Sequence, residues 1–202
     1  KLFPTGQESS ELLGSLKNKV ESNPNLTVYT SANVKNIDGF VGNYEIEVEQ
    51  NGNSTNLTIG VIVVAVGASL LTPTGKFEYD GNVRITQYEL EKKLMNNEVN
   101  AKDIVMIQCV GARNDERKYC SNVCCMTALK NSLLIKEKNP DTNITILFRD
   151  LYTPGTHYEE YYRRAREAGV IFLSYKLEKE PSVDDTNIKV FNEYIGEEIS
   201  IP

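Results

Sequence analysis

The fold is decided by three neighbouring segments, which are IVMI at residues 104–107, CCMTALKNSLLIKEK at residues 124–138 and NITILF at residues 143–148. The first and third segments are short, apolar and bounded by polar residues, which is typical of buried strands. The middle segment has apolar residues at helical spacing and is followed by Asn139-Pro140, which ends a helix. Its predicted inward face consists of Met126, Leu129, Leu133 and Leu134. The segments predict a strand–helix–strand unit.

A second helix and a third strand continue this alternation. Residues 158–168 predict a helix that stops at Gly169, and residues 170–174 predict the next strand. Short strand–helix–strand connections require parallel strands with right-handed crossovers. The predicted fold class is therefore α/β with a Rossmann-like parallel sheet. Residues 187–201 predict an antiparallel pair beyond that sheet.

The N-terminal part of the chain predicts one helix followed by antiparallel strands. The helix covers residues 8–22, with Ser9 or Ser10 as its cap. Its apolar face consists of Leu12, Leu13, Leu16 and Val20. Strands are predicted at residues 26–29, 32–37, 44–49 and 54–58, with turns at Asp38-Gly39 and at residues 51–53. Strict alternation at residues 44–49 indicates a half-buried strand, so these strands predict a β-meander.

A nearly uninterrupted apolar run follows the meander. Residues 59–66 predict a buried parallel strand that stops at Gly67. Residues 69–97 form a connector that contains a short helix near residues 87–95. We expect the boundary between two structural parts near residue 97, so that they cover residues 1–97 and 98–202.

Composition excludes several classes of protein. The formal net charge is −6 and no stripe of basic residues is present, which argues against a nucleic-acid partner. The longest apolar runs fall far below the roughly 20 residues of a membrane span. All four cysteines fall between positions 109 and 125, unlike the dispersed cysteines of a secreted disulfide framework. We therefore expect a cytoplasmic protein without a membrane span, and the ends of the chain suggest a segment of something longer.

The cysteines occupy the place where an open α/β sheet binds its ligands. Cys109 follows the strand at residues 104–107, and Cys124 and Cys125 begin the next helix. A helix N-terminus favours thiolates and anions, and Cys120 lies on the intervening loop, which is long enough to fold back. A dinucleotide site would need the glycine pattern G-x-G-x-x-G here, and only Gly111 is present. The four sulfurs are thus candidate ligands of one metal centre.

Spacing alone leaves three readings open. Zinc prefers cysteine pairs with two to four intervening residues; Cys120 and Cys124 have three between them, whereas Cys124 and Cys125 are adjacent. Adjacent ligands suit a cluster with several iron corners better than a single tetrahedral ion. A redox centre would more commonly be C-x-x-C, which is absent. An iron–sulfur cluster is favoured, while zinc and redox-active or inert thiols remain as alternatives.

Two cysteine-containing motifs resemble those of a known protein family. The motifs IQCVGAR at residues 107–113 and YCSNVCC at residues 119–125 resemble the A subunit of heterodisulfide reductase. Flanking stretches at residues 70–91 and 149–167 agree, so the resemblance covers essentially residues 24–175. Val66 stands where the family has a threonine.

The resemblance implies a thioredoxin-reductase-like flavoprotein whose second domain holds a 4Fe–4S cluster. It implies that Cys109, Cys120, Cys124 and Cys125 are the ligands, and that no residue of this chain is catalytic. Residues 1–97 would belong to a FAD-binding domain, with Gly67 near the flavin, and residues 98–202 would form the cluster domain. FAD is expected only in the complete subunit, because the chain lacks the pyrophosphate-binding glycine turn.

The implied function is electron transfer between the cluster and FAD. The implied partners are other subunits of a heterodisulfide reductase-like complex and ferredoxin-type carriers, and the segment alone is expected to be inactive. The alternative function is a zinc-stabilised or metal-free module that docks subunits. His157 and Asp150 are expected to have surface and structural roles.

Overall fold

The structure is a computed structural model that describes residue 2, residues 6–184 and residues 186–202. The chain divides into two compact units, residues 7–70 and residues 71–202. The first unit contains an antiparallel sheet, and the second contains one parallel and one antiparallel sheet.

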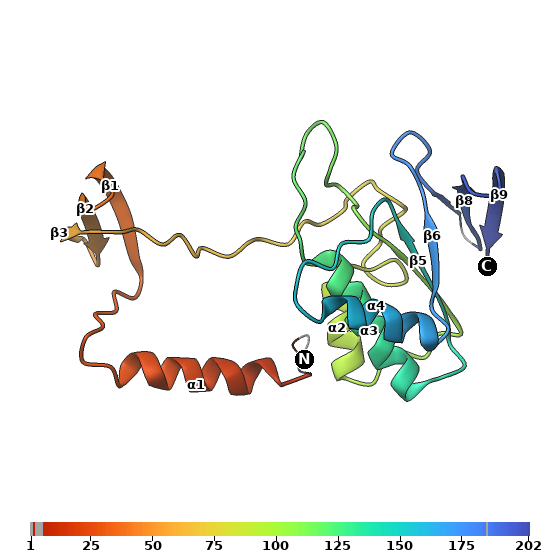
Figure 1. The fold of residues 1–202 in the computed structure, drawn as a ribbon, viewed down its shortest axis with the longest axis horizontal. Coiled ribbons are helices and arrows are strands. Elements are labelled where there is room, and N and C mark those ends of the chain that lie inside the picture. Colours follow the sequence, from red (N-terminus) through yellow and green to blue (C-terminus); the bar gives the residue numbers. More distant parts are fainter. Residues whose placement is uncertain (1, 3–5, 185) are drawn as a thin grey trace. The chain divides into compact units, whose positions relative to one another are not determined.

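The first unit consists of one helix and a β-meander (Figure 1). The helix α1 is Ser9–Glu21, and the strands are β1 (Ala32–Phe40), β2 (Asn43–Gln50) and β3 (Asn53–Ile59). All neighbouring strands are antiparallel, with β2 in the centre. The predicted meander and its turn at Asn51-Gly52 are confirmed.

Two details of the meander were predicted wrongly. Residues 26–29 form no strand, and Asp38-Gly39 lies within β1 rather than in a turn. Gly39 pairs with Tyr44 at φ +97°, and a Cβ at this position would collide with the backbone carbonyl of Asn43. The strand continues here because glycine permits that close approach.

The predicted helix α1 is confirmed, but its predicted cap is wrong. The residue before the helix is Glu8, and no side chain caps the first turn. None of the helix residues is buried. All four residues of the predicted apolar face are exposed, namely Leu12, Leu13, Leu16 and Val20.

The predicted strand at residues 59–66 is also wrong. Ile59 ends β3, and residues 61–70 have no regular secondary structure. Val63 and Val66 are 84% and 89% exposed. A buried parallel strand needs at least one neighbouring strand to pair with, and within the described residues no strand pairs with this run.

The second unit contains the predicted parallel sheet. Its strands are β4 (Asp103–Ile107), β5 (Asn143–Phe148) and β6 (Ile171–Ser174), in the order β4-β5-β6. Both pairs are parallel, and the crossovers contain α3 (Cys124–Lys138) and α4 (Tyr158–Glu167). The α/β fold class with a Rossmann-like parallel sheet is confirmed.

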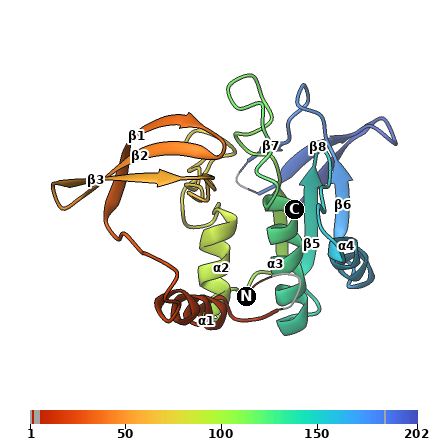
Figure 2. The same ribbon diagram turned by 60° about the vertical axis from the view of Figure 1, so that its left-hand side comes forward.

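Two apolar layers cover the sheet. On one face, Met106, Ile144 and Ile146 pack against buried residues of α2 (Gln87–Met95), α3 and α4 (Figure 2). On the other face, Leu147 packs with Tyr175 and Val190. Val190 belongs to β8 of the antiparallel sheet β7 (Ser182–Val183), β8 (Ile188–Asn192) and β9 (Glu197–Ile201). The antiparallel pair was predicted, and β7 was not.

Helix α2 belongs to the core of the second unit. Leu90 and Leu94 are buried in the same cluster as Met126 and Leu129 of α3. Residues 71–97 therefore pack with residues 98–202. Whether residues 1–97 form part of a FAD-binding domain stays a prediction. Across the described residues, the structure has no helix with the length and apolar character needed to cross a membrane.

Candidate metal centre

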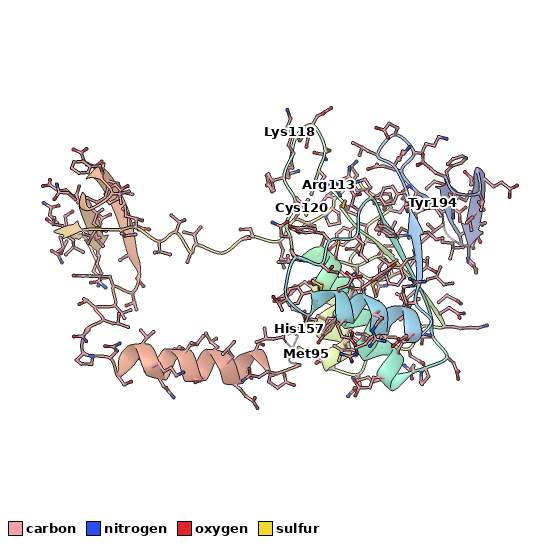
Figure 3. The ribbon with its side chains drawn as sticks, in the orientation of Figure 1. Met95, Arg113, Lys118, Cys120, His157 and Tyr194 are labelled. Atoms are coloured by element: carbon pink, nitrogen blue, oxygen red, sulfur yellow. The ribbon has the colours of Figure 1, made fainter. Side chains whose placement is uncertain are left out.

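The candidate site is the loop between β4 and α3. Cys109 lies two residues beyond the end of β4, and Cys124 and Cys125 are the first two residues of α3. Figure 3 shows Lys118 at the outer part of this loop, with Arg113 and Cys120 nearer the body of the unit. The site thus lies where strand carboxyl ends and a helix N-terminus meet, as the sequence predicted.

The loop contains several sharp turns. Cys109, Arg113 and Asn122 all have positive φ angles, of 62°, 57° and 58°. Each costs roughly 1–2 kcal/mol for a residue with a side chain, so the surrounding contacts must hold these turns. Gly111 has φ +69°, and a Cβ there would collide with the side chain of Leu71. Glycine avoids both the strain of this φ and the contact with Leu71.

Three of the four cysteines are neighbours. The pKa of the Cys124 thiol is lowered to about 6, first because the Cys125 thiol donates a hydrogen bond to it. The Ser121 hydroxyl and the backbone N–H of Cys109 also donate to the Cys124 sulfur, whereas partial burial acts in the opposite direction. Cys124 is therefore ready to act as a thiolate, which is the form that binds metals.

The Cys125 thiol has the opposite character. Its pKa is raised, first because it shares its proton with the Cys124 sulfur and second because it is buried. It also lies 3.9 Å from the backbone carbonyl oxygen of Asp150, and negative charge at Cys109 and Cys124 adds to the effect. A second thiolate here requires positive charge from a bound metal or cluster.

Cys120 lies on the loop itself, four residues before the start of α3. Its sulfur accepts a hydrogen bond from the backbone N–H of Asn122 at 3.3 Å. Across the described part of the chain, no hydrogen bond joins the Cys120 sulfur to the other three cysteines. The structure thus brings together Cys109, Cys124 and Cys125, and leaves the role of Cys120 as a prediction.

The sequence analysis did not assign Arg113 and Arg149 to the site. Arg113 lies 3.8 Å from the Cys109 sulfur and 2.5 Å from a carboxylate oxygen of Asp150. Arg149 donates hydrogen bonds to the backbone carbonyls of Ala112 and Arg113, at 2.6 and 2.7 Å. Asp150, expected to be structural, thus pairs with a side chain that contacts a candidate ligand.

The donor chemistry of the site fits an anionic sulfur-rich group. Gln108, next to Cys109, is 2% exposed, and its Nε2 has no hydrogen-bond partner in the structure. The Nε of Arg149 is likewise buried without a partner. Buried donors of this kind are normally satisfied, and sulfur atoms of a cluster accept N–H hydrogen bonds.

The geometry does not form a site for a single metal ion. Within the part of the chain that the structure describes, no three Cys, His, Asp or Glu side chains are grouped closely enough to hold one.

Two other predicted positions are outside this loop in the sequence. Gly67 is exposed at φ +70°, with open space where a Cβ would stand. Its predicted nearness to a flavin stays a prediction. His157 is an exposed residue before α4, as the sequence predicted.

Comparisons with known proteins identify relatives of one kind. The iron–sulfur A subunit of CoB–CoM heterodisulfide reductase from Methanocaldococcus jannaschii is 27% identical over an alignment that covers 100% of this chain and 45% of the relative. The A subunit of the ferredoxin/F420H2-dependent CoB–CoM heterodisulfide reductase from Methanosarcina acetivorans is 36% identical, over 69% of this chain and 20% of the relative. A protein of Archaeoglobus profundus that is named as similar to the heterodisulfide reductase A subunit is 50% identical over 37% of this chain. This chain spans less than half the length of these relatives.

Other comparisons add little. No family model matches the chain. A solved Cu(II) complex of a variant of the HOCl-induced flavoprotein disulfide reductase RclA from Escherichia coli has 12% identity and a TM-score of 0.38, over 95% of this chain and 39% of that one. A score this low does not establish a shared fold.

The sequence relatives agree with one another in name, and the alignment with the Methanocaldococcus jannaschii protein extends over the whole chain. Over its whole length, the chain is therefore homologous to part of the heterodisulfide reductase A subunits.

Proposed function

We propose that this chain is an electron-transfer segment of a heterodisulfide reductase-like flavoprotein subunit, and that its four cysteines hold a 4Fe–4S cluster. The observation that carries the proposal is the gathering of Cys109, Cys124 and Cys125 between the end of β4 and the N-terminus of α3. When bound, such a cluster supplies a one-electron relay and breaks no substrate bond.

The residues of the chain would have distinct tasks in this function. Cys124 supplies a thiolate at neutral pH, because its sulfur accepts several hydrogen bonds. Arg149, just beyond the end of β5, donates to the carbonyl oxygens of Ala112 and Arg113 and so holds the backbone of the loop that follows Cys109. Cys120, four residues before Cys124 on the same loop, would complete the ligand set. The N-terminus of α3 favours the negative charge of the assembled group.

FAD belongs to the proposal only through the complete subunit. Residues 1–97 would be part of its FAD-binding domain, and Gly67 would lie near the flavin. Other subunits of the complex and ferredoxin-type carriers are the proposed partners, since one relative is named for its dependence on ferredoxin. The isolated chain should retain neither FAD nor NAD, and stoichiometric flavin bound to it would overturn the domain assignment.

Metal and sulfide analysis tests the cluster directly. Protein reconstituted anaerobically with iron and sulfide should be brown and contain about four irons and four sulfides per chain. The rival function, a zinc-stabilised or metal-free module that docks subunits, predicts zinc without sulfide or no metal at all. Either of those results would falsify the cluster proposal.

The relay itself is tested in the complete subunit. Cys124→Ser should leave FAD occupancy near normal, because serine is well tolerated at the start of a helix. Reduction of the flavin by the electron donor of the complex should collapse, since a serine oxygen is a poor iron ligand. Lys118→Gln, an exposed change on the same loop, is the matched control and should behave as wild type. Wild-type flavin reduction in a Cys124→Ser protein without the cluster would make the cluster structural.

A further inference from the structure

Arg113 connects a candidate ligand to the neighbouring strand. One nitrogen of its guanidinium group lies 3.8 Å from the Cys109 sulfur, and the other lies 2.5 Å from Asp150 Oδ2. Asp150 follows directly after Arg149, just beyond the end of β5. A planar guanidinium can donate in two directions at once, which an ammonium on a flexible stem does less well.

The backbone of Arg113 is fixed by the same strand end. Arg149 donates to the carbonyl oxygen of Arg113 at 2.7 Å and to that of Ala112 at 2.6 Å. These bonds hold Arg113 at a positive φ that a residue with a side chain rarely adopts. Residues 149 and 150 thus fix both the main chain and the side chain of Arg113.

We propose that Arg113 is a positioning residue that holds the Cys109 sulfur for ligation and raises the reduction potential of the bound cluster. The inference rests on the proposed function. Reduction adds negative charge to a cluster, and hydrogen bonds and positive charge at a ligand sulfur stabilise that charge. Arg113 is placed to supply both at Cys109.

Arg117 is the matched comparison on the same loop. Its guanidinium lies 3.5 Å from the carbonyl oxygen of Gly111 and 3.7 Å from a carboxylate oxygen of Glu116. It carries the same charge as Arg113, but it contacts these oxygens rather than a cysteine sulfur. A general effect of loop charge would therefore be seen in both arginines, whereas positioning of Cys109 is specific to Arg113.

The test uses the full chain, reconstituted anaerobically with iron and sulfide. The midpoint potential of the cluster is measured by a redox titration followed by electron paramagnetic resonance. At the wild-type midpoint, Arg113→Gln should lower the ratio of reduced to oxidised cluster about tenfold, which corresponds to about 59 mV for a one-electron couple. Asp150→Asn should lower the potential less, and Arg117→Gln should leave it unchanged.

The outcomes separate this inference from the proposed function. A wild-type chain that takes up no iron and sulfide overturns the proposed function, and the inference with it. If wild type and Arg113→Gln both assemble and titrate at the same midpoint, Arg113 has no such role while the proposed function stands. If Arg113→Gln does not assemble, Arg113→Lys decides, because it keeps the charge without the planar fork. A lowered midpoint or reduced iron content in that variant supports positioning, and wild-type values overturn it.

Discussion

The ammonium group of Lys130 on α3 lies 2.6 Å from a carboxylate oxygen of Glu91 on α2. The Lys130 side chain is 9% exposed and the Glu91 side chain is 26% exposed, so the pair lies at the buried seam between two helices. Beside this pair, Asn131 is fully buried and donates to the side-chain and backbone oxygens of Gln87. These polar contacts fix how α2 sits on the helix that carries two of the candidate ligands.

The Lys130–Glu91 pair should contribute measurable stability. Lys130→Met should lower the free energy of unfolding by about 2 kcal/mol, because the charged partner loses a buried hydrogen bond. A double-mutant cycle with Glu91→Gln should give a coupling energy of about 1 kcal/mol or more from urea unfolding. The exposed pair Arg163–Glu160 is the control and should couple by no more than about 0.5 kcal/mol. Equal coupling energies in the two cycles would contradict a special role for the Lys130–Glu91 pair between α2 and α3.

A second prediction concerns the boundary of the unit that contains the four cysteines. Leu90 and Leu94 of α2 are 8% and 5% exposed in the core of this unit. Removing one such leucine side chain typically costs about 2–5 kcal/mol, a large part of the stability of a domain. Residues 71–202 should therefore unfold in one cooperative transition, while residues 98–202 should lack it. Circular dichroism during thermal unfolding of both segments makes the comparison. Equal stability would favour the boundary at residue 97 that the sequence suggested.

The start of α2 should make stability depend on pH. Thr86 and Glu89 form a reciprocal cap, and the backbone N–H of Thr86 is the first cause that lowers the pKa of Glu89, followed by the Thr86 hydroxyl. A carboxyl whose folded pKa is lowered contributes stability above its unfolded pKa, and that contribution is lost as the pH falls through the folded value. The stability difference between wild type and Glu89→Gln should thus be present in full at pH 7, begin to shrink below about pH 4 and vanish only once the pH has fallen past the lowered folded pKa.

A companion variant checks the cap itself. Thr86→Ala should cost about 1 kcal/mol at pH 7 and should weaken the pH dependence, since the carboxylate loses a partner. Urea unfolding of the three proteins between pH 3 and pH 7 provides the measurement. A wild-type minus Glu89→Gln difference that stays constant across this range would rule out the cap as its source.

Local signals explain which elements could be predicted from the sequence. The bounds of α3 and β5 were predicted as the structure has them, because Asn139-Pro140 stops the helix and polar residues flank the apolar strand. The run at residues 59–66 was predicted wrongly, since an apolar run becomes a strand only where other strands pair with it. The predicted inward face of α3 left out buried residues such as Asn131 for a related reason. Asn131 is buried because Gln87 binds it, and that contact depends on the packing of α2.

In the candidate site, too, some features could be predicted from the sequence and others could not. Strand end and helix start are local features, so the positions of Cys109, Cys124 and Cys125 could be predicted. The network of Arg113, Arg149 and Asp150 could not, because it joins residues 36 and 37 positions apart through the parallel pairing of β4 with β5. An arginine four residues after a candidate ligand was the only local signal.

Cys120 provides the sharpest test of the ligand set, because its contacts leave it apart from the other cysteines. Its sulfur accepts a hydrogen bond from the backbone N–H of Asn122, and a serine oxygen can accept the same N–H. Cys120→Ser should therefore leave the fold of the metal-free chain unchanged.

If Cys120 is the fourth ligand, the Cys120→Ser chain should hold less iron after anaerobic reconstitution, about three irons or fewer in place of four, since the corner without its thiolate is lost readily. Tyr119→Phe is the matched control, because Tyr119 is 67% exposed and removal of its hydroxyl should change neither iron content nor spectrum. Iron and sulfide analysis with electron paramagnetic resonance distinguishes the outcomes. Four irons and a wild-type spectrum in Cys120→Ser would show that another residue ligates the fourth corner.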